Sequence, residues 1–421
     1  MSVLAKSWSA SIDLRRLAYA AAGVFLAVLG VLHWGFYQHN LILDTIEYHR
    51  YGDLMNHGQV PYRDFGVEYP PGALPVFALP AIGHPSFRVY HREFQALMAL
   101  CGIGALVAMA VALRSVGASV GRAAAALGFA ALAPLVLGSI VLYRYDLWPT
   151  ALAVAGLAGV LAGRQRLGFA ALGLGIAAKV FPAALVPPAL AYVWRRSGRR
   201  EALLCLAAAA AVAGACVIPF LALAPHGVWR SVVDQTTRPL QIESLGSAVL
   251  VTAHQFGGLG LAVVSSHGSQ NLAGSRVDAA GQIESVVLVV ALLAVWAAAV
   301  LGPAQPERLV RYAVASVIAF VAFSKVLSPQ FMIWLIPLVP LVRGRRGIAA
   351  SALLGLALLL TQLWFPIRYW RLVFNLDDGL WFVVLLRDLV LVALLAVLVW
   401  PPKATLAVPS PGRAGSARTS D

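Results

Sequence analysis

Charged residues are scarce in this chain. Asp and Glu number 18 among 421 residues, all charged residues make up 12%, and hydrophobic residues make up 60%. The mean hydropathy is +0.80. Such a composition excludes a soluble domain whose surface is covered by water. It predicts an all-α polytopic membrane protein, because helices satisfy their own backbone hydrogen bonds in lipid.

Motifs of several common chemistries are also missing: there is no P-loop, no Rossmann glycine fingerprint and no His-Glu-x-x-His zinc helix. There is no Asp-x-Asp pair to anchor a metal-bound nucleotide sugar, and the nine histidines show no metal-ligand spacing. The three cysteines fall within predicted helices and suggest neither a disulfide nor a thiolate site. The sequence therefore indicates neither a metal site nor a cofactor.

Long apolar runs are what the sequence has instead. Runs of about 17 to 25 residues suit a hydrocarbon core of roughly 30 Å. Residues 167–194 are interrupted by Lys179 and Pro182 and flanked by arginines on both sides, which predicts a hairpin. With a short return helix at 331–342, we expect about twelve transmembrane or re-entrant helices. The full-length runs lie near 17–37, 91–113, 122–142, 147–163, 201–223, 283–302, 309–324, 347–364 and 380–400.

Basic residues fall in alternate loops, which the positive-inside rule assigns to the cytoplasm. The net charge of +14 is therefore an orientation signal rather than a nucleic-acid footprint. We expect one membrane domain over residues 1–402, with both ends cytoplasmic and an uncleaved first helix. It should carry extracytoplasmic loops at 38–90 and 225–282 and a disordered cytoplasmic tail at 403–421. The basic residues concerned are Lys6, Arg15, Arg16, Arg114, Arg122, Arg164, Arg166, Arg195, Arg196, Arg199, Arg200, Arg308, Arg311, Arg343, Arg345 and Arg346.

The first predicted external loop concentrates acid, with five of the 18 carboxylates between residues 44 and 72. Asp44 directly follows the first predicted helix, where a rigid element could hold it as a general base. Glu68 and Tyr69 begin a stiff turn that ends in Pro-Pro-Gly. The alternative is a solvated acidic loop with a helix cap, because structural and functional acids look alike in a sequence.

Three further segments place cations at the same predicted face. Arg144 lies in a tight turn, where it could meet Asp146 or an anionic headgroup; the alternative is a local ion pair anchored by interfacial tyrosines. Lys179 and Lys325 each lie beside a proline between two short apolar segments. A lysine there is costly unless it faces a cavity or an anion, although its side chain could also snorkel to the interface. Together these cations would suit a phosphate.

The remaining candidates are more scattered. The predicted loop at 225–282 contains Arg238, Glu243 and His254 in a stretch that mixes polar and apolar residues like a surface-lying helix. Gln330 follows the second lysine segment. In the last apolar run, Arg387 and Asp388 are expected to pair with each other or between helices.

Taken in order, these segments resemble glycosyltransferase family 87, the polyprenyl-phosphate-mannose-dependent mannosyltransferases of actinobacteria. The resemblance rests on the early Asp44, an EYPPG turn, RYD at a turn, G-x-x-A-K-x-F-P at 175–182 and SPQF-x-x-W-L-x-P at 328–337. It implies a GT-C fold with an extracytoplasmic active site in the bacterial plasma membrane. It also implies inverting transfer of mannose from a polyprenyl-phosphate donor to a lipid or glycan hydroxyl.

The same resemblance implies that Asp44 is the catalytic base. We expect the substrates to contact Glu68, Tyr69, Arg144, Asp146, Lys179, Arg238, Glu243, His254, Lys325 and Gln330. The expected partners are the lipid donor, the acceptor and membrane lipids, with no nucleic acid. Arabinose remains a competing sugar. A lipid-linked-sugar flippase, which would need charged groups near the bilayer midplane, and a non-catalytic scaffold remain alternative classes.

Overall fold

The computed structural model describes residues 2–400, with side chains from residue 13 onward, so the expected tail at 403–421 lies outside the described part. The first half of the chain forms α1 (Ser2–Val31), α2 (Thr45–Asn56), α3 (Leu74–Ala78), α4 (Phe87–Ser115), α5 (Val120–Leu137), α6 (Ile140–Tyr143), α7 (Leu147–Leu161), α8 (Gln165–Ala178) and α9 (Val186–Ser197). The second half forms α10 (Arg199–Leu223), α11 (Pro225–Thr236), α12 (Leu245–Gly257), β1 (Ala262–Ser266), β2 (Ser269–Ala273), α13 (Val277–Leu301), α14 (Pro306–Ala322), α15 (Met332–Leu338), α16 (Gly344–Trp364), α17 (Tyr369–Phe374) and α18 (Trp381–Val399). Short 3₁₀ turns join several of them.

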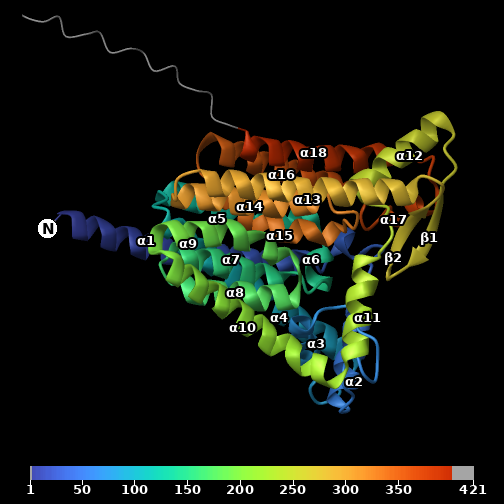
Figure 1. The fold of residues 1–421 in the computed structure, drawn as a ribbon, viewed down its shortest axis with the longest axis horizontal. Coiled ribbons are helices and arrows are strands. Elements are labelled where there is room, and N and C mark those ends of the chain that lie inside the picture. Colours follow the sequence, from blue (N-terminus) through green and yellow to red (C-terminus); the bar gives the residue numbers. More distant parts are fainter. Residues whose placement is uncertain (1, 401–421) are drawn as a thin grey trace, which may run out of the picture.

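The long helices lie side by side along the longest axis of the molecule (Figure 1). Seven of them in the described part are long and apolar enough to span a membrane: α1, α4, α5, α10, α13, α16 and α18. The shorter α7, α8, α9, α14 and α15 run among them. This arrangement confirms the all-α polytopic architecture, with the hairpin and the return helix that the sequence predicts.

The short helices end inside the bundle, and this positions polar residues at depth. A helix of 14 residues, such as α8, is only about 21 Å long. It stops at Ala178 because Lys179 turns to extended backbone and Pro182 opens the next turn. Likewise, α14 stops at Ala322, and Pro329 starts the turn that leads into α15. Both α14 and α15 are almost wholly buried, so neighbouring helices cover them and lipid does not.

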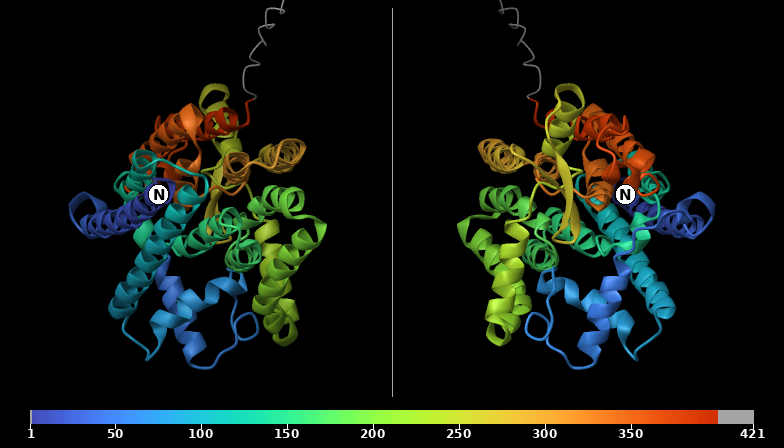
Figure 2. Two further views of the ribbon diagram at one scale, coloured as in Figure 1. Left: turned by 90° about the vertical axis from the view of Figure 1, so that its left-hand side faces the viewer. Right: turned by 90° about the vertical axis from the view of Figure 1, so that its right-hand side faces the viewer.

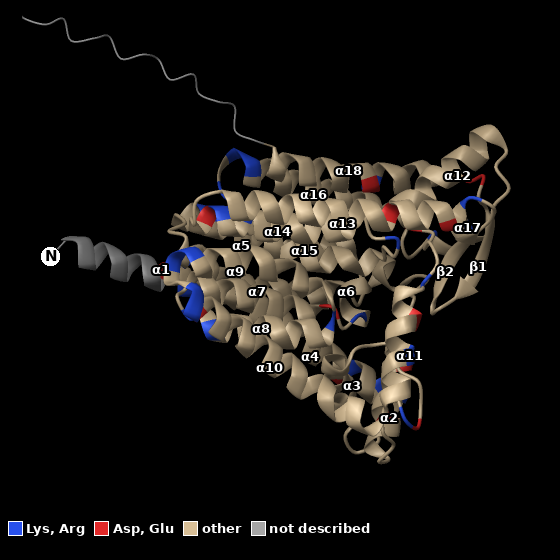
Figure 3. Ribbon diagram, in the orientation of Figure 1, with Lys and Arg blue, Asp and Glu red and all other residues tan. Residues whose placement is uncertain are grey.

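Basic residues gather at the end of the bundle where α1 begins (Figure 3). Arg166 pairs with Glu201 there at 2.7 Å, and Arg343 pairs with Glu307 at 2.7 Å. At the opposite end, α2, α3, α11, α12, α17 and the two strands form a cap over the helices (Figures 1 and 2). The basic loops thus lie together, as the alternation of charge along the sequence predicts.

The cap contains an antiparallel hairpin that the all-helical expectation did not include. Strands β1 and β2 pair from Ala262 with Ala273 to Ser266 with Ser269. The turn between them is formed by His267 and Gly268, both with positive φ, which is the geometry of a two-residue hairpin turn. Two five-residue strands in a membrane protein leave little periodicity to detect.

The acidic first loop is fixed to the start of α7 and to the end of α8. The carbonyl of Gly72 accepts a hydrogen bond from Trp148 Nε1 at 3.1 Å. A Cβ at Gly72 would lie 2.5 Å from the backbone carbon of Ala177, so only glycine permits this close approach. The EYPPG turn therefore packs directly beside Lys179, and the first loop and the α8–α9 hairpin form one wall.

Candidate active site

A cavity of about 580 Å³ lies where the cap meets the ends of the short helices. Its wall is built from the first loop, the RYD turn, the α8–α9 hairpin, the segment between α11 and α12, the hairpin turn, α13, the segment between α14 and α15, and α17. Four cations and three carboxylates line it: Arg144, Lys179, Arg238, Lys325, Asp44, Glu68 and Glu243. The polar groups predicted from separate segments therefore meet at one place.

Nine of the eleven predicted site residues line this cavity. Asp146 and His254 do not. Several residues that were not assigned to the site also line it, among them Tyr145, Gln235, Gln241, Ser328, Trp334 and Tyr369. Tyr145 and Trp334 belong to the RYD and SPQF-x-x-W motifs, which offered a signal, whereas Tyr369 follows no motif and only the packing of α17 brings it here.

Asp44 forms an ion pair with Arg144 across the wall of the cavity. Asp44 precedes α2, but its side chain makes no capping hydrogen bond, and its carboxylate turns toward Arg144 and the Tyr48 hydroxyl. The alternative of a simple helix cap is therefore excluded. Arg144 is only 6% exposed, because the RYD turn is buried and the guanidinium points inward, toward Asp44. Among the described residues, Arg144 Nε has no hydrogen-bond partner.

Lys179 is held by a buried carboxylate and a set of aromatic rings. Its Nζ lies 2.6 Å from Asp146 Oδ1, which also accepts a hydrogen bond from Trp334 Nε1 at 2.6 Å. The ammonium lies 4.7 Å from the Tyr145 ring centre and 5.5 Å from that of Phe331. Asp146, which was predicted to contact substrate, is fully buried and does not line the cavity. From behind the cavity wall it positions Lys179.

A second pair of cations is fixed by the backbone of the cap. Lys325 Nζ donates to the carbonyl of Thr236 at 3.1 Å. The amide of Gln241 donates to the carbonyl of Lys325 at 2.9 Å, and Gln241 Nε2 donates to Ser328 Oγ at 2.9 Å. These bonds tie the segment after α11 to the segment before α15. Arg238 lies in the first of these segments, between Thr236 and Gln241, so its backbone is fixed beside the cavity.

Glu243 is a buried acid at the cavity wall, only 3% exposed. Burial raises the pKa of its carboxyl to about 7, while the charge of Arg387 and hydrogen bonds from Gln241 and Tyr369 act in the opposite direction. Arg387 also donates to the carbonyl of Glu243 at 2.7 Å and pairs with Asp388 at 2.6 Å, which confirms the predicted ion pair in α18. Within the part of the chain that the structure describes, Glu243 Oε2 is buried and has no hydrogen-bond partner.

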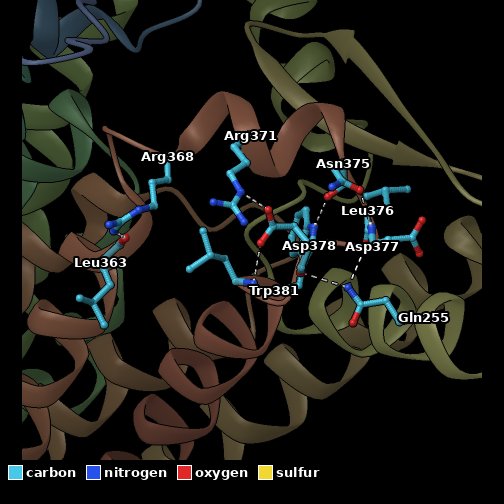
Figure 4. Close-up of polar contacts among 10 residues, drawn as sticks. Gln255, Leu363, Arg368, Arg371, Asn375, Leu376, Asp377, Asp378 and Trp381 are labelled. Atoms are coloured by element: carbon cyan, nitrogen blue, oxygen red, sulfur yellow. Dashed lines mark hydrogen bonds and ion pairs between the residues drawn. The ribbon is translucent and has the colours of Figure 1, made fainter.

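His254 lies away from the cavity, in contrast to its prediction as a substrate contact. Its Nδ1 lies 2.5 Å from the carbonyl of Leu259, and its Nε2 lies 3.5 Å from Asp377. The neighbouring Gln255 donates to the carbonyls of Leu376 and Asp378 (Figure 4). His254 and Gln255 of α12 thus fasten the segment between α17 and α18.

The contacts of α12 with the segment between α17 and α18 hold α17 over the cavity. Asp378 is almost fully buried, pairs with Arg371 of α17 and accepts a hydrogen bond from the amide of Leu380 at 2.9 Å (Figure 4). Because Tyr369 lies on the same short helix, these contacts fix its ring at the cavity wall. Asp377 and Asp378 therefore make contacts within the cap and do not line the cavity.

The bundle and its cavity define a multi-pass membrane protein with a pocket at one end that is lined by four cations and three carboxylates. The sequence model of Glycosyltransferase family 87 matches residues 68–329, more than half of the chain, and the chain belongs to this family. The resemblance seen in the motifs is thereby confirmed, and the protein is a membrane glycosyltransferase.

Other comparisons are more distant. Crystal structures of ArnT from Cupriavidus metallidurans, one bound to undecaprenyl phosphate and one in the apo state, are 15% and 14% identical to this chain. The alignments cover 91% and 93% of this chain and 75% and 76% of the ArnT chains, each with a TM-score of 0.47. No curated protein sequence matches the chain significantly.

Proposed function

We propose that this glycosyltransferase moves mannose from a polyprenyl-phosphate donor to a hydroxyl of a lipid or glycan acceptor, with inversion, on the extracytoplasmic face of the cell membrane. The observation that carries the proposal is the meeting of Asp44 with Arg144, Lys179, Arg238 and Lys325 around one cavity. A phosphate leaving group needs cations, and an attacking hydroxyl needs a base. The cavity offers both within one wall.

In the proposed reaction, Asp44 accepts the proton of the acceptor hydroxyl as its oxygen attacks the anomeric carbon. A new carbon–oxygen bond forms on the face opposite the phosphate. The bond from the anomeric carbon to the phosphate oxygen breaks, and the polyprenyl phosphate leaves with the bonding electron pair. One displacement therefore inverts the anomeric configuration.

The developing charge on the phosphate is stabilised by cations that are already in place. Preorganised charges in a site that excludes water are worth more than the same charges in water. Lys179 offers a point charge, and Arg144 offers a planar fork whose Nε has no partner in the described region, residues 2–400. Binding of the phosphate beside Arg144 also loosens the contact between Arg144 and Asp44, which frees the carboxylate for the acceptor hydroxyl.

Apolar residues of the wall suit the lipid part of the donor. Leu288 of α13, Phe320 of α14 and Phe331 before α15 line the cavity. A headgroup can therefore meet the cations while its chain extends between helices toward the bilayer.

The test is transfer of radiolabelled sugar by the purified protein in proteoliposomes, with polyprenyl-phosphate mannose and polyprenyl-phosphate arabinose offered separately with extracted lipid and lipoglycan acceptors. We expect mannose in the acceptor fraction and inverted product stereochemistry. Transfer of arabinose alone would replace the sugar and keep the enzyme class. Movement of the labelled lipid across the bilayer without transfer would overturn the proposal in favour of a flippase.

Glu243 gives this reaction an expected pH dependence. Its neutral carboxyl can donate a hydrogen bond to a phosphate oxygen, whereas the ionised form repels it. Because its pKa is about 7, kcat/KM of the parent should fall as the pH rises through that value. Glu243→Gln keeps a donor at every pH, so its profile should lack this fall. A profile of kcat/KM from about pH 5.5 to 8.5 measures both; an identical alkaline fall in Glu243→Gln would assign it to another group.

A further inference from the structure

Two histidines and one carboxylate gather at the outer end of α2, outside the cavity. His84 Nδ1 lies 3.0 Å from Asp53 Oδ1, and His57 Nδ1 lies 3.5 Å from the same oxygen. One ligand atom from each of the three residues lies within 4.8 Å of the other two. The spacing of the histidines along the chain did not indicate this histidine–aspartate cluster, because His84 joins it only through the fold.

The two distances that involve Asp53 Oδ1 fit a bound transition metal. Zinc holds nitrogen and oxygen ligands at about 2.0–2.2 Å, so neighbouring ligand atoms of a tetrahedral site are roughly 3.3 Å apart. The two distances to Asp53 Oδ1 bracket this value. The side chains are 39% to 56% exposed, which leaves room for water to complete the coordination.

The fold brings the three residues together in two steps. Asp53 and His57 are four residues apart at the end of α2, so they share one face of the helix. His84 comes from the loop before α4, where Gly83 and His84 both have positive φ. That conformation is uncommon for a histidine, and here it turns the ring toward α2 until the centres of the His57 and His84 rings are 4.1 Å apart.

The simpler reading is a hydrogen-bonded cluster without metal. His57 Nδ1 also lies 2.9 Å from the backbone carbonyl of Asp53, a contact that needs a proton on that nitrogen. A metal would replace the proton on Nδ1 of each ring, leaving both rings protonated on Nε2. The two interpretations predict different responses of the protein to zinc, and these responses can be measured.

We propose that Asp53, His57 and His84 bind a divalent transition-metal ion, with Zn²⁺ as the best match to two imidazoles and one carboxylate. The ion would join the end of α2 to the loop before α4 and so close the segment between residues 53 and 84. That segment carries Glu68 and Tyr69 into the cavity wall. The metal stabilises this part of the wall and takes no part in the transfer.

The test uses tag-free full-length protein in detergent, titrated with Zn²⁺ in competition with a chromophoric chelator. The parent should bind one zinc ion per chain, and His84→Ala and Asp53→Asn should each weaken this binding by at least about tenfold. His226→Ala removes an exposed histidine of α11, outside the cluster, and should bind as the parent does. Hydrogen exchange of residues 58–83 should slow with zinc in the parent and stay unchanged in His84→Ala.

Equal zinc binding by the parent and by both His84→Ala and Asp53→Asn would overturn the proposal and leave an adventitious ion only. A variant that fails to fold is recognised by its gel-filtration profile. The zinc affinity of the other variant then tests the proposal. Neither readout depends on sugar transfer. The proposal of a metal site and the proposal of a glycosyltransferase reaction can therefore be refuted separately.

Discussion

Replacing Asp44 by asparagine should lower the rate of sugar transfer by about 10³-fold, within the range of 10² to 10⁴ attributed to a positioned general base. Asparagine has nearly the same shape, and its carbonyl oxygen can still face Arg144. It cannot accept the proton of the acceptor hydroxyl. Donor binding should change much less than the rate, so kcat in the radiolabelled transfer assay is the informative quantity.

The matched control is Glu47→Gln. Glu47 lies on α2, three residues after Asp44, but its carboxylate pairs with Arg50 at the surface and does not line the cavity. Its transfer rate should stay within about twofold of the parent, as for most surface changes. Full activity of Asp44→Asn would remove Asp44 from the reaction and make Glu68, the other carboxylate of this loop at the cavity, the next candidate.

Lys179→Met should lower kcat by about 10²- to 10³-fold, the usual effect of removing one group that stabilises a developing anion. It should also destabilise the protein, because Asp146 is fully buried and would lose its partner. Breaking a buried ion pair from one side costs about 3–5 kcal/mol. The measurements are transfer kinetics and the midpoint of thermal unfolding in detergent.

The double variant Lys179→Met/Asp146→Asn separates the two effects. It removes both charges, while the side-chain amide that replaces the Asp146 carboxylate keeps an oxygen for the hydrogen bond from Trp334 Nε1. Neutral replacement of both partners is often close to neutral in stability. We therefore expect the unfolding midpoint to recover and the transfer rate to stay low. Recovery of both would mean that Lys179 has only a structural role.

Much of the fold could be predicted from the sequence because the relevant information is local. The length of each apolar run and the basic residues beside it predict where the chain crosses and in which direction. The interruption at Lys179 and Pro182 predicts the hairpin, and its helices α8 and α9 end where expected. The β-hairpin was missed because ten residues of strand carry little periodicity.

The candidate site was predictable in its parts but not in its contacts. Asp44, Lys179 and Lys325 stood out because a charge beside an apolar segment is costly and needs a reason. Tyr369 carried no such signal, since a tyrosine near a membrane interface is common. His254 looked polar and accessible, yet the packing of α12 against the α17–α18 segment turns it away from the cavity.

The sequence by itself determined the class of protein, the alternation of its helices and the segments that carry polar groups, because hydrophobic length and charge can be counted along the chain. Only the tertiary structure decided which groups meet. Arg144 contacts Asp44 and not its neighbour Asp146, and Asp146 instead holds Lys179, 33 residues away. Partners of buried charges are set by the packing of helices against one another, and spacing along the chain does not encode that packing.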